Sequence, residues 1–161
     1  MKNIIVVRID DRLIHGQVVT SWIRSYPITD IVIIAEDLSK NMLMQRIYKS
    51  VAPDGIRVAI FNNPDALAFL NGEGNPKENI MILVKTPDVL EYLFDNGIHF
   101  SKIILGGMGA KPGREVLIRN VSANEAEKET LLRLIDKGIE IVYQMIPIDN
   151  ALDVEKLLRG K

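Results

Sequence analysis

The 161-residue chain contains no cysteine, which excludes a disulfide framework and a cysteine-ligated zinc site. It also lacks an excess of either charge, with 20 Lys and Arg against 21 Asp and Glu, so non-specific binding to nucleic acid is not expected. No apolar run approaches the roughly 18–20 residues that span a membrane. The first such run, Ile4 to Val7, is too short for a signal peptide. We therefore expect a cytoplasmic protein that does not bind nucleic acid.

The length suits a single domain over residues 1–161, because domains commonly have about 100–200 residues. Short β-branched segments alternate with longer amphipathic stretches. The expected strands are Ile4–Val7, Ile31–Ile34, Val58–Phe61, Ile80–Val84, Ile103–Leu105 and Ile139–Tyr143, with a further short strand near Val116–Ile118. The expected helices are Gln17–Arg24, Ser39–Ser50, Pro64–Leu70, Pro87–Asn96, Asn124–Lys137 and Val154–Leu158. This order predicts an α/β fold, with a mainly parallel, doubly wound sheet of about six or seven strands and helices on both faces.

Three polar segments follow predicted strands directly. They are "RIDDRLIHGQ" (8–17), "KTPD" (85–88) and "GGMGAKPGR" (106–114). Ligands of doubly wound sheets bind beyond the carboxyl ends of the strands. We therefore expect these segments to converge in space and to form the functional site.

The first of these segments has the highest density of ionisable side chains, namely Arg8, Asp10, Asp11, Arg12 and His15. Imidazole is a good nucleophile near neutral pH, and His15 precedes Gly16 at the expected start of a helix, where free N–H groups attract anions. Guanidinium groups bind phosphate through forked hydrogen bonds, which suits Arg8 and Arg12. Either aspartate could accept a hydrogen bond from a ring nitrogen of His15 and so fix its tautomer, or could hold an arginine in position. The combination favours covalent phosphorylation of His15.

Other interpretations of this segment remain open at this stage. Asp10, Asp11 and His15 contain metal-ligand atoms, but the adjacent arginines oppose a cation, so we expect neither a metal nor a cofactor. Solvated loop ion pairs of little energetic value are the ordinary alternative. The second histidine, His99, lies among apolar neighbours and is expected to be structural.

The other two segments also allow two interpretations each. The glycines of "GGMGAKPG" fit neither the Walker A nor the dinucleotide-binding pattern. They predict either a tight turn or a backbone N–H cradle that includes Gly107, with Lys111 or Arg114 adding charge. In "KTPD", Lys85 and Thr86 either precede and cap a helix or contact phosphate.

The segment "VRIDDRLIHGQVVTSW" resembles the signature of the mannose/sorbose-family enzyme IIB component of the bacterial phosphoenolpyruvate-dependent sugar phosphotransferase system. The segments "MILVKTPDVLEYLFDNGI", "KIILGGMGAKPGRE" and "LIDKGIEIVYQMIPIDNALDVEKLL" resemble later parts of that family in the same order. The resemblance therefore covers nearly the whole chain. It implies a mainly parallel sheet flanked by helices, in agreement with the pattern above.

The resemblance also implies a role for this chain. The family's histidine accepts a phosphoryl group from a phosphohistidine on IIA, usually through Nδ1, and passes it to a sugar held by the membrane components IIC and IID. By this resemblance His15 is the phosphorylated residue, Arg12 stabilises the phosphoryl group and Asp10 orients the ring or a guanidinium. Arg8 carries over less directly. The protein would then work at the inner face of the membrane through the transporter.

Two rival functions share this site. A stand-alone enzyme with a histidine base would need a deep pocket and a second acid or base. A regulatory module would be phosphorylated without passing the group to sugar. A relay protein instead needs an exposed site, and Leu13, Ile14 and Met108 are the expected apolar rim for its partners. A homodimer is compatible with the sequence, which selects neither an oligomeric state nor a sugar.

Overall fold

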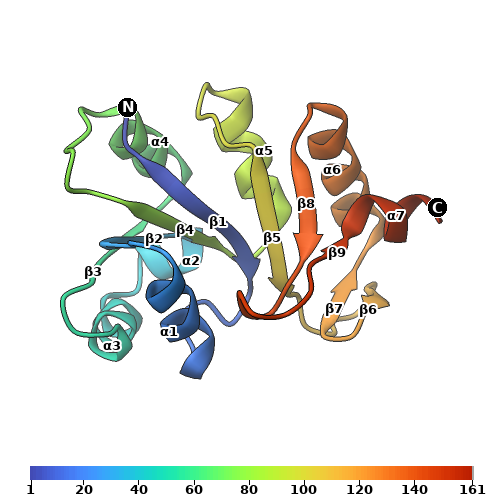
Figure 1. Ribbon diagram of the computed structural model, residues 1–161, viewed down its shortest axis with the longest axis horizontal. Coiled ribbons are helices and arrows are strands. Elements are labelled where there is room, and N and C mark those ends of the chain that lie inside the picture. The colour runs from blue at the N-terminus through green and yellow to red at the C-terminus, as the bar shows by residue number, and fades with distance from the viewer. Residues whose placement is uncertain (161) are drawn as a thin grey trace.

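The computed structural model describes residues 1–160, in which a seven-stranded sheet has the strand order β3-β2-β4-β1-β5-β8-β9 (Figure 1). The strands are β1 (Ile4–Asp10), β2 (Asp30–Ile34), β3 (Arg57–Phe61), β4 (Ile80–Val84), β5 (Lys102–Gly107), β8 (Glu140–Tyr143) and β9 (Leu152–Asp153). All neighbouring strands pair in parallel except β8 and β9, which are antiparallel. The predicted α/β fold with a mainly parallel sheet is confirmed.

Helices cover both faces of this sheet. They are α1 (Gly16–Ser25), α2 (Glu36–Ser39), α3 (Met42–Val51), α4 (Asn63–Asn71), α5 (Pro87–Asp95), α6 (Glu125–Asp136) and α7 (Val154–Arg159). Helices α1 to α3 pack on one face, and α4 to α7 pack on the other. A separate hairpin of β6 (Glu115–Ile118) and β7 (Val121–Ala123) lies between β5 and α6 in the chain. None of the helices in residues 1–160 is long and apolar enough to cross a membrane.

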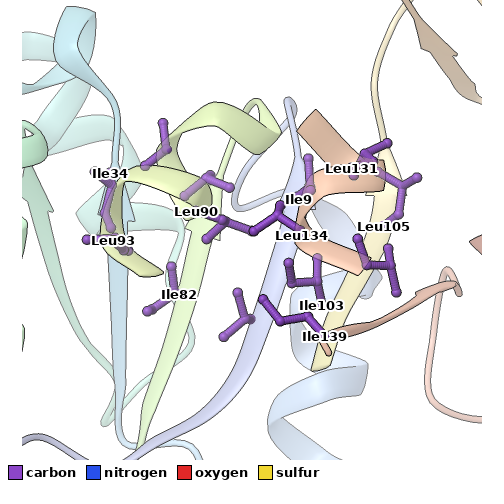
Figure 2. Packing of buried hydrophobic residues seen from close by; sticks show 14 of the residues in the cluster. Ile9, Ile34, Ile82, Leu90, Leu93, Ile103, Leu105, Leu131, Leu134 and Ile139 are labelled. Carbon is purple, nitrogen blue, oxygen red and sulfur yellow. The ribbon is translucent and has the colours of Figure 1, made fainter. Parts of the chain in front are cut away.

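Two apolar cores, one on each face, hold the layers together. Along β4, Ile80, Ile82 and Val84 point into the core under α4 to α6, and Met81 and Leu83 point into the core under α1 to α3. This alternation is the period of two of a strand, and burial on both sides explains the continuous apolar run. Figure 2 shows the first core, where Leu90 and Leu93 of α5 and Leu131 and Leu134 of α6 meet the sheet.

The observed elements correct the predictions at several places. The first strand ends at Asp10, not at Val7, so Arg8 and Asp10 lie within β1 and are buried. Their polar side chains hid the strand from a search for apolar runs, yet the ladder with β5 continues through Arg8. The helix predicted over Ser39–Ser50 corresponds to α3, but it starts later: Ser39 ends the short helix α2, and the Asn41 side chain caps α3 by accepting a hydrogen bond from the Met44 N–H.

The chain leaves β1 and β5 toward opposite edges of the sheet. From β1 it runs through α1 to β2, and from β5 it runs through α6 to β8, although β1 and β5 are neighbours. Such a reversal opens a crevice at the carboxyl ends of the two strands, where ligands of this fold class bind. The segments that follow β1 and β5 therefore meet at this point.

Candidate functional site

A tight loop brings His15 back over the end of β1. Leu13 and Gly16 have φ angles of 57° and 46°, and the Leu13 N–H donates to the Asp10 carbonyl at 2.9 Å. Leu13 tolerates this left-handed conformation because its side chain is buried in the core beneath the loop. His15 is the N-cap of α1, and within residues 1–160 its side chain makes no capping hydrogen bond. The first N–H groups of the ten-residue helix α1, which have no acceptor within the helix, therefore lie beside the imidazole.

The fully buried carboxylate of Asp10 is the centre of the site. Its Oδ1 accepts hydrogen bonds from the backbone N–H and the Nε of Arg12, both at 3.1 Å. Its Oδ2 lies 3.2 Å from the Nη2 atoms of Arg8 and Arg12 and 3.2 Å from the Nε2 of His15. Burial alone would raise the pKa of Asp10, but the hydrogen bond from Arg12, the charge of Arg8 and the hydrogen bond with His15 outweigh it and lower that pKa. Asp10 is therefore a permanent anion at neutral pH.

This carboxylate determines which nitrogen of His15 carries the free lone pair. An ionised carboxylate only accepts hydrogen bonds, so the Nε2 that faces Asp10 carries the proton. In the neutral ring the lone pair available for attack then lies on Nδ1. The side chain of His15 is 24% exposed, so a second protein can reach it. The geometry thus pairs an oriented imidazole with a fixed anion, an arrangement that catalytic triads also use.

Arg8 is a buried support for Asp10. Its side chain is only 1% exposed, donates from Nη1 to the Gln144 carbonyl at 2.8 Å, and lies 5.4 Å from the centre of the Trp22 ring. Burial lowers the pKa of Arg8, and the charge of Asp10 opposes that shift. A Cβ at position 106 would overlap the Arg8 guanidinium, so only glycine fits there. In the structure, Arg8 holds the carboxylate of Asp10. Direct contact between Arg8 and a phosphoryl group stays a prediction.

Arg12 is the arginine that faces the surface. Its guanidinium forms a forked pair with Asp10 yet is 44% exposed. Its Nη1 has no hydrogen-bond partner within the described residues, and two N–H donors there remain for an incoming anion. Gly107 packs against this pair, since a Cβ there would lie 3.0 Å from Asp10 Oδ1 and 3.1 Å from Arg12 Nη2.

Asp11, for which the family resemblance implied no role, connects the two loops of the crevice. Its Oδ2 accepts the Gly109 N–H at 2.7 Å and lies 3.7 Å from Nη1 of Arg114. The buried Arg114 guanidinium donates to the Gly109 carbonyl and to both carboxylate oxygens of Glu127 at the start of α6. Arg114 therefore fixes the glycine segment. The Gly109 N–H already has a partner, so this part of the segment is a braced turn, and a phosphate-binding cradle that includes Gly107 stays a prediction.

Among the described residues, no hydrogen bond joins the remaining predicted residues to His15. Lys85 and Thr86 follow β4 at the same edge of the sheet, but Lys85 Nζ pairs with Asp37 Oδ2 at 2.9 Å. The Lys111 side chain is exposed. Phosphate contacts by these three residues stay predictions. His99 precedes β5, at the opposite end of the sheet, and packs edge-on against Phe94 as a structural residue.

The predicted apolar rim of Leu13, Ile14 and Met108 is wrong, because all three side chains are buried in the two cores. The cavity beside the imidazole is instead about 180 Å³ and is lined by Ile14, His15, Gly16, Val19, Thr20, Val51 and Pro53. Pockets for small molecules commonly have about 300–1,000 Å³, so this shallow cavity disfavours a stand-alone enzyme that encloses its substrate.

Sequence reasoning missed the residues that brace the site from a distance. Met145 accepts the Trp22 indole N–H at its carbonyl, and its Sδ lies 3.6 Å from Nη2 of Arg12. Asn120 donates to the Gly106 carbonyl at 2.7 Å and accepts a hydrogen bond from the Tyr143 hydroxyl. No local motif marks these residues, because their role comes from tertiary contacts. Those of Met145 join it to residues more than 100 positions away in the sequence.

The fold and site together define a class of protein: an α/β domain that presents one carboxylate-oriented histidine at a helix N-terminus on its surface. Residues 4–161 match the family described as the PTS system sorbose subfamily IIB component. The chain belongs to this family, which confirms the resemblance found in the sequence. It is thus a IIB component of a phosphotransferase system.

Known relatives agree with this assignment. The chain is similar to the "PTS system fructose-specific EIIB component" of Bacillus subtilis, with 26% identity over 99% of this chain and 98% of that one. It is 27% identical to the "PTS system mannose-specific EIIAB component" of Escherichia coli over 95% of this chain, but spans only 47% of that longer protein. The crystal structure of manxB from Thermoanaerobacter tengcongensis has a TM-score of 0.91 and 34% identity, covering 99% of this chain and 96% of that one.

Proposed function

We propose that the chain is a phosphoryl carrier: His15 accepts a phosphoryl group from a phosphohistidine on IIA and passes it to a sugar held by the membrane components IIC and IID. The observation that carries this proposal is the hydrogen bond between His15 Nε2 and Asp10, which leaves the Nδ1 lone pair free at the surface. The name of the Escherichia coli relative, an EIIAB component, supports IIA as the donor. In this proposal residues 1–161 act as one domain at the inner face of the membrane.

The transfer step balances without an external acid or base. The Nδ1 lone pair of neutral His15 attacks phosphorus, and the bond between phosphorus and the donor's ring nitrogen breaks with its electron pair returning to that ring. His15 becomes a phosphoimidazolium, and the donor, if its other nitrogen is protonated, leaves as neutral imidazole. The fixed Asp10 carboxylate stabilises the positive charge that the His15 ring gains. In the onward step a sugar hydroxyl oxygen bonds to phosphorus, the bond from phosphorus to Nδ1 breaks with its electron pair returning to the now neutral His15 ring, and the hydroxyl proton passes to a base on the acceptor side or to water.

The phosphoryl oxygens find two kinds of donor at this place. Side chains at an N-cap lie within reach of the first free N–H groups of their helix, and those of α1 have the positive end of the helix dipole behind them. Arg12 supplies a charged donor through Nη1, which has no partner among residues 1–160. Both kinds stabilise charge on the equatorial oxygens during transfer, which is the main source of catalysis in phosphoryl transfer.

Arg12→Ala is expected to slow phosphoryl transfer to His15 by about 100-fold, because it removes one preorganised charged donor. The fold should persist, since the side chain is 44% exposed and Asp10 keeps its contacts with Arg8 and His15. Rapid-quench kinetics with phosphorylated IIA measure the rate, and Arg24→Ala at the exposed end of α1 is the matched control. An Arg12→Ala rate equal to that of the control would remove Arg12 from the mechanism.

The function itself is tested by following label through the whole relay. Purified protein is incubated with radiolabelled phospho-IIA, then with membranes that contain IIC, IID and a panel of sugars. We expect label first on this chain and then on a sugar. Failure of the chain to take up label contradicts the carrier function. Uptake without any passage to sugar favours the regulatory alternative.

A further inference from the structure

Helix α3 presents an apolar row to solvent next to the site. None of its residues, Met42–Val51, is buried in the described structure, although Met44 and Tyr48 pack partly against the core. On its outer side, Leu43, Ile47 and Val51 are 67%, 43% and 54% exposed. Because they are four residues apart, they form a continuous row along one flank of the helix. Exposed apolar residues scattered singly are ordinary, but a contiguous row indicates an interaction surface.

The row leads to the reactive histidine. Val51, at its end, lines the same small cavity as His15 and Gly16. Figure 1 shows α3 beside α1, the helix that His15 caps. A protein that covers the Val51 end of the row therefore reaches the cavity that His15 lines, where it is placed to exclude water from the phosphoryl group during transfer.

The charges around the row indicate which partner it suits. Lys40, Arg46 and Lys49 are exposed, and they have no ion-pair partner in the part of the chain that the structure describes. Helix α3 contains no acidic residue. The flank of the row is therefore basic, and it complements a partner with acidic side chains at its rim.

We propose that Leu43, Ile47 and Val51, with the basic flank of α3, form the docking surface for the phosphorylated IIA donor. This inference rests on the proposed function. The membrane components suit the surface less well, because their cytoplasmic loops are enriched in Lys and Arg, which a basic flank repels. A phosphorylated donor brings negative charge to the same place. The row is small, as is appropriate for a complex that must dissociate after each transfer.

The test compares one substitution on the row with the same substitution away from it. Ile47→Asp places a carboxylate in the centre of the row, and Ile148→Asp is the matched control, since Ile148 is 86% exposed and lies in the turn after β8. Transfer from phospho-IIA is measured over a range of donor concentrations. Phosphoramidate, a small chemical donor that needs no docking surface, measures the intrinsic reactivity of His15 in each variant.

For Ile47→Asp we expect kcat/KM with phospho-IIA to fall about tenfold through a higher KM, with labelling by phosphoramidate unchanged. Ile148→Asp should match wild type with both donors. Wild-type kinetics of Ile47→Asp with phospho-IIA would overturn the inference, and so would an equal loss with both donors or a loss confined to the transfer to sugar. Failure of the carrier function is distinguishable, because the wild-type chain would then take no label from phospho-IIA.

Discussion

His15→Gln is expected to accept no measurable phosphoryl group from phospho-IIA, a loss of more than about 1,000-fold. An amide nitrogen is not nucleophilic, so no bond to phosphorus forms. Glutamine is the informative replacement because its amide N–H takes the place of Nε2–H as a donor to Asp10. The buried carboxylate therefore keeps a partner, and the loss of transfer cannot be attributed to unfolding.

The control is His99→Gln, which removes the other histidine at the opposite end of the sheet. This variant should carry label at the wild-type level. Acid-labile, alkali-stable label measured on both variants distinguishes phosphohistidine from phosphoserine or phosphothreonine. Label of that kind on His15→Gln would show that another residue is the acceptor.

Asp10→Asn is expected to slow transfer by about 100- to 10,000-fold, by analogy with other oriented histidines that lose their carboxylate. An amide neither stabilises the phosphoimidazolium nor fixes the proton on Nε2, because it offers donor and acceptor atoms alike. The substitution also leaves the buried Arg8 without its counter-charge. Removing one partner of a buried ion pair commonly costs about 3–5 kcal/mol of stability.

The stability loss of Asp10→Asn should depend on pH. The pKa of Asp10 is lowered in the folded protein, so its carboxylate stabilises the fold above the unfolded pKa of about 4, and this contribution disappears as the pH falls. Urea unfolding should therefore show a large difference between wild type and variant near neutral pH. The difference should shrink progressively in acid. A difference that is constant with pH would contradict the assigned charge of Asp10.

The general fold could be predicted because local pattern and tertiary environment agree. Strands such as β4 are buried on both faces, so their sequence is a continuous apolar run, and the alternation with amphipathic helices determines a parallel sheet. The end of β1 could not be found in this way. Arg8 and Asp10 occupy buried positions that pattern analysis reserves for apolar residues, and their pairing with each other and with further hydrogen-bond partners in the fold permits this burial.

The sequence named the residues that meet at the candidate site, and it missed the residues that support them. The segment around His15 carries its chemistry locally, so Asp10, Arg12 and His15 could be named from spacing and family resemblance. The structure brings the three together around one carboxylate. The structural role of Asp11 depends on its hydrogen bond with Gly109, almost 100 residues away in the sequence. No sequence pattern indicates that contact. The predicted apolar rim was wrong for the same reason, because the burial of Leu13 depends on the assembled core and cannot be read from the local sequence.

The central claim is that His15 carries the phosphoryl group on Nδ1 while Nε2 remains bonded to Asp10. Multinuclear NMR of the protein with 15N-labelled histidine, phosphorylated by phospho-IIA, measures this directly through the coupling between phosphorus and the ring nitrogens. The account predicts a single phosphohistidine with phosphorus bonded to Nδ1 of His15 and a protonated Nε2. Phosphorus on Nε2, or on His99, would contradict it.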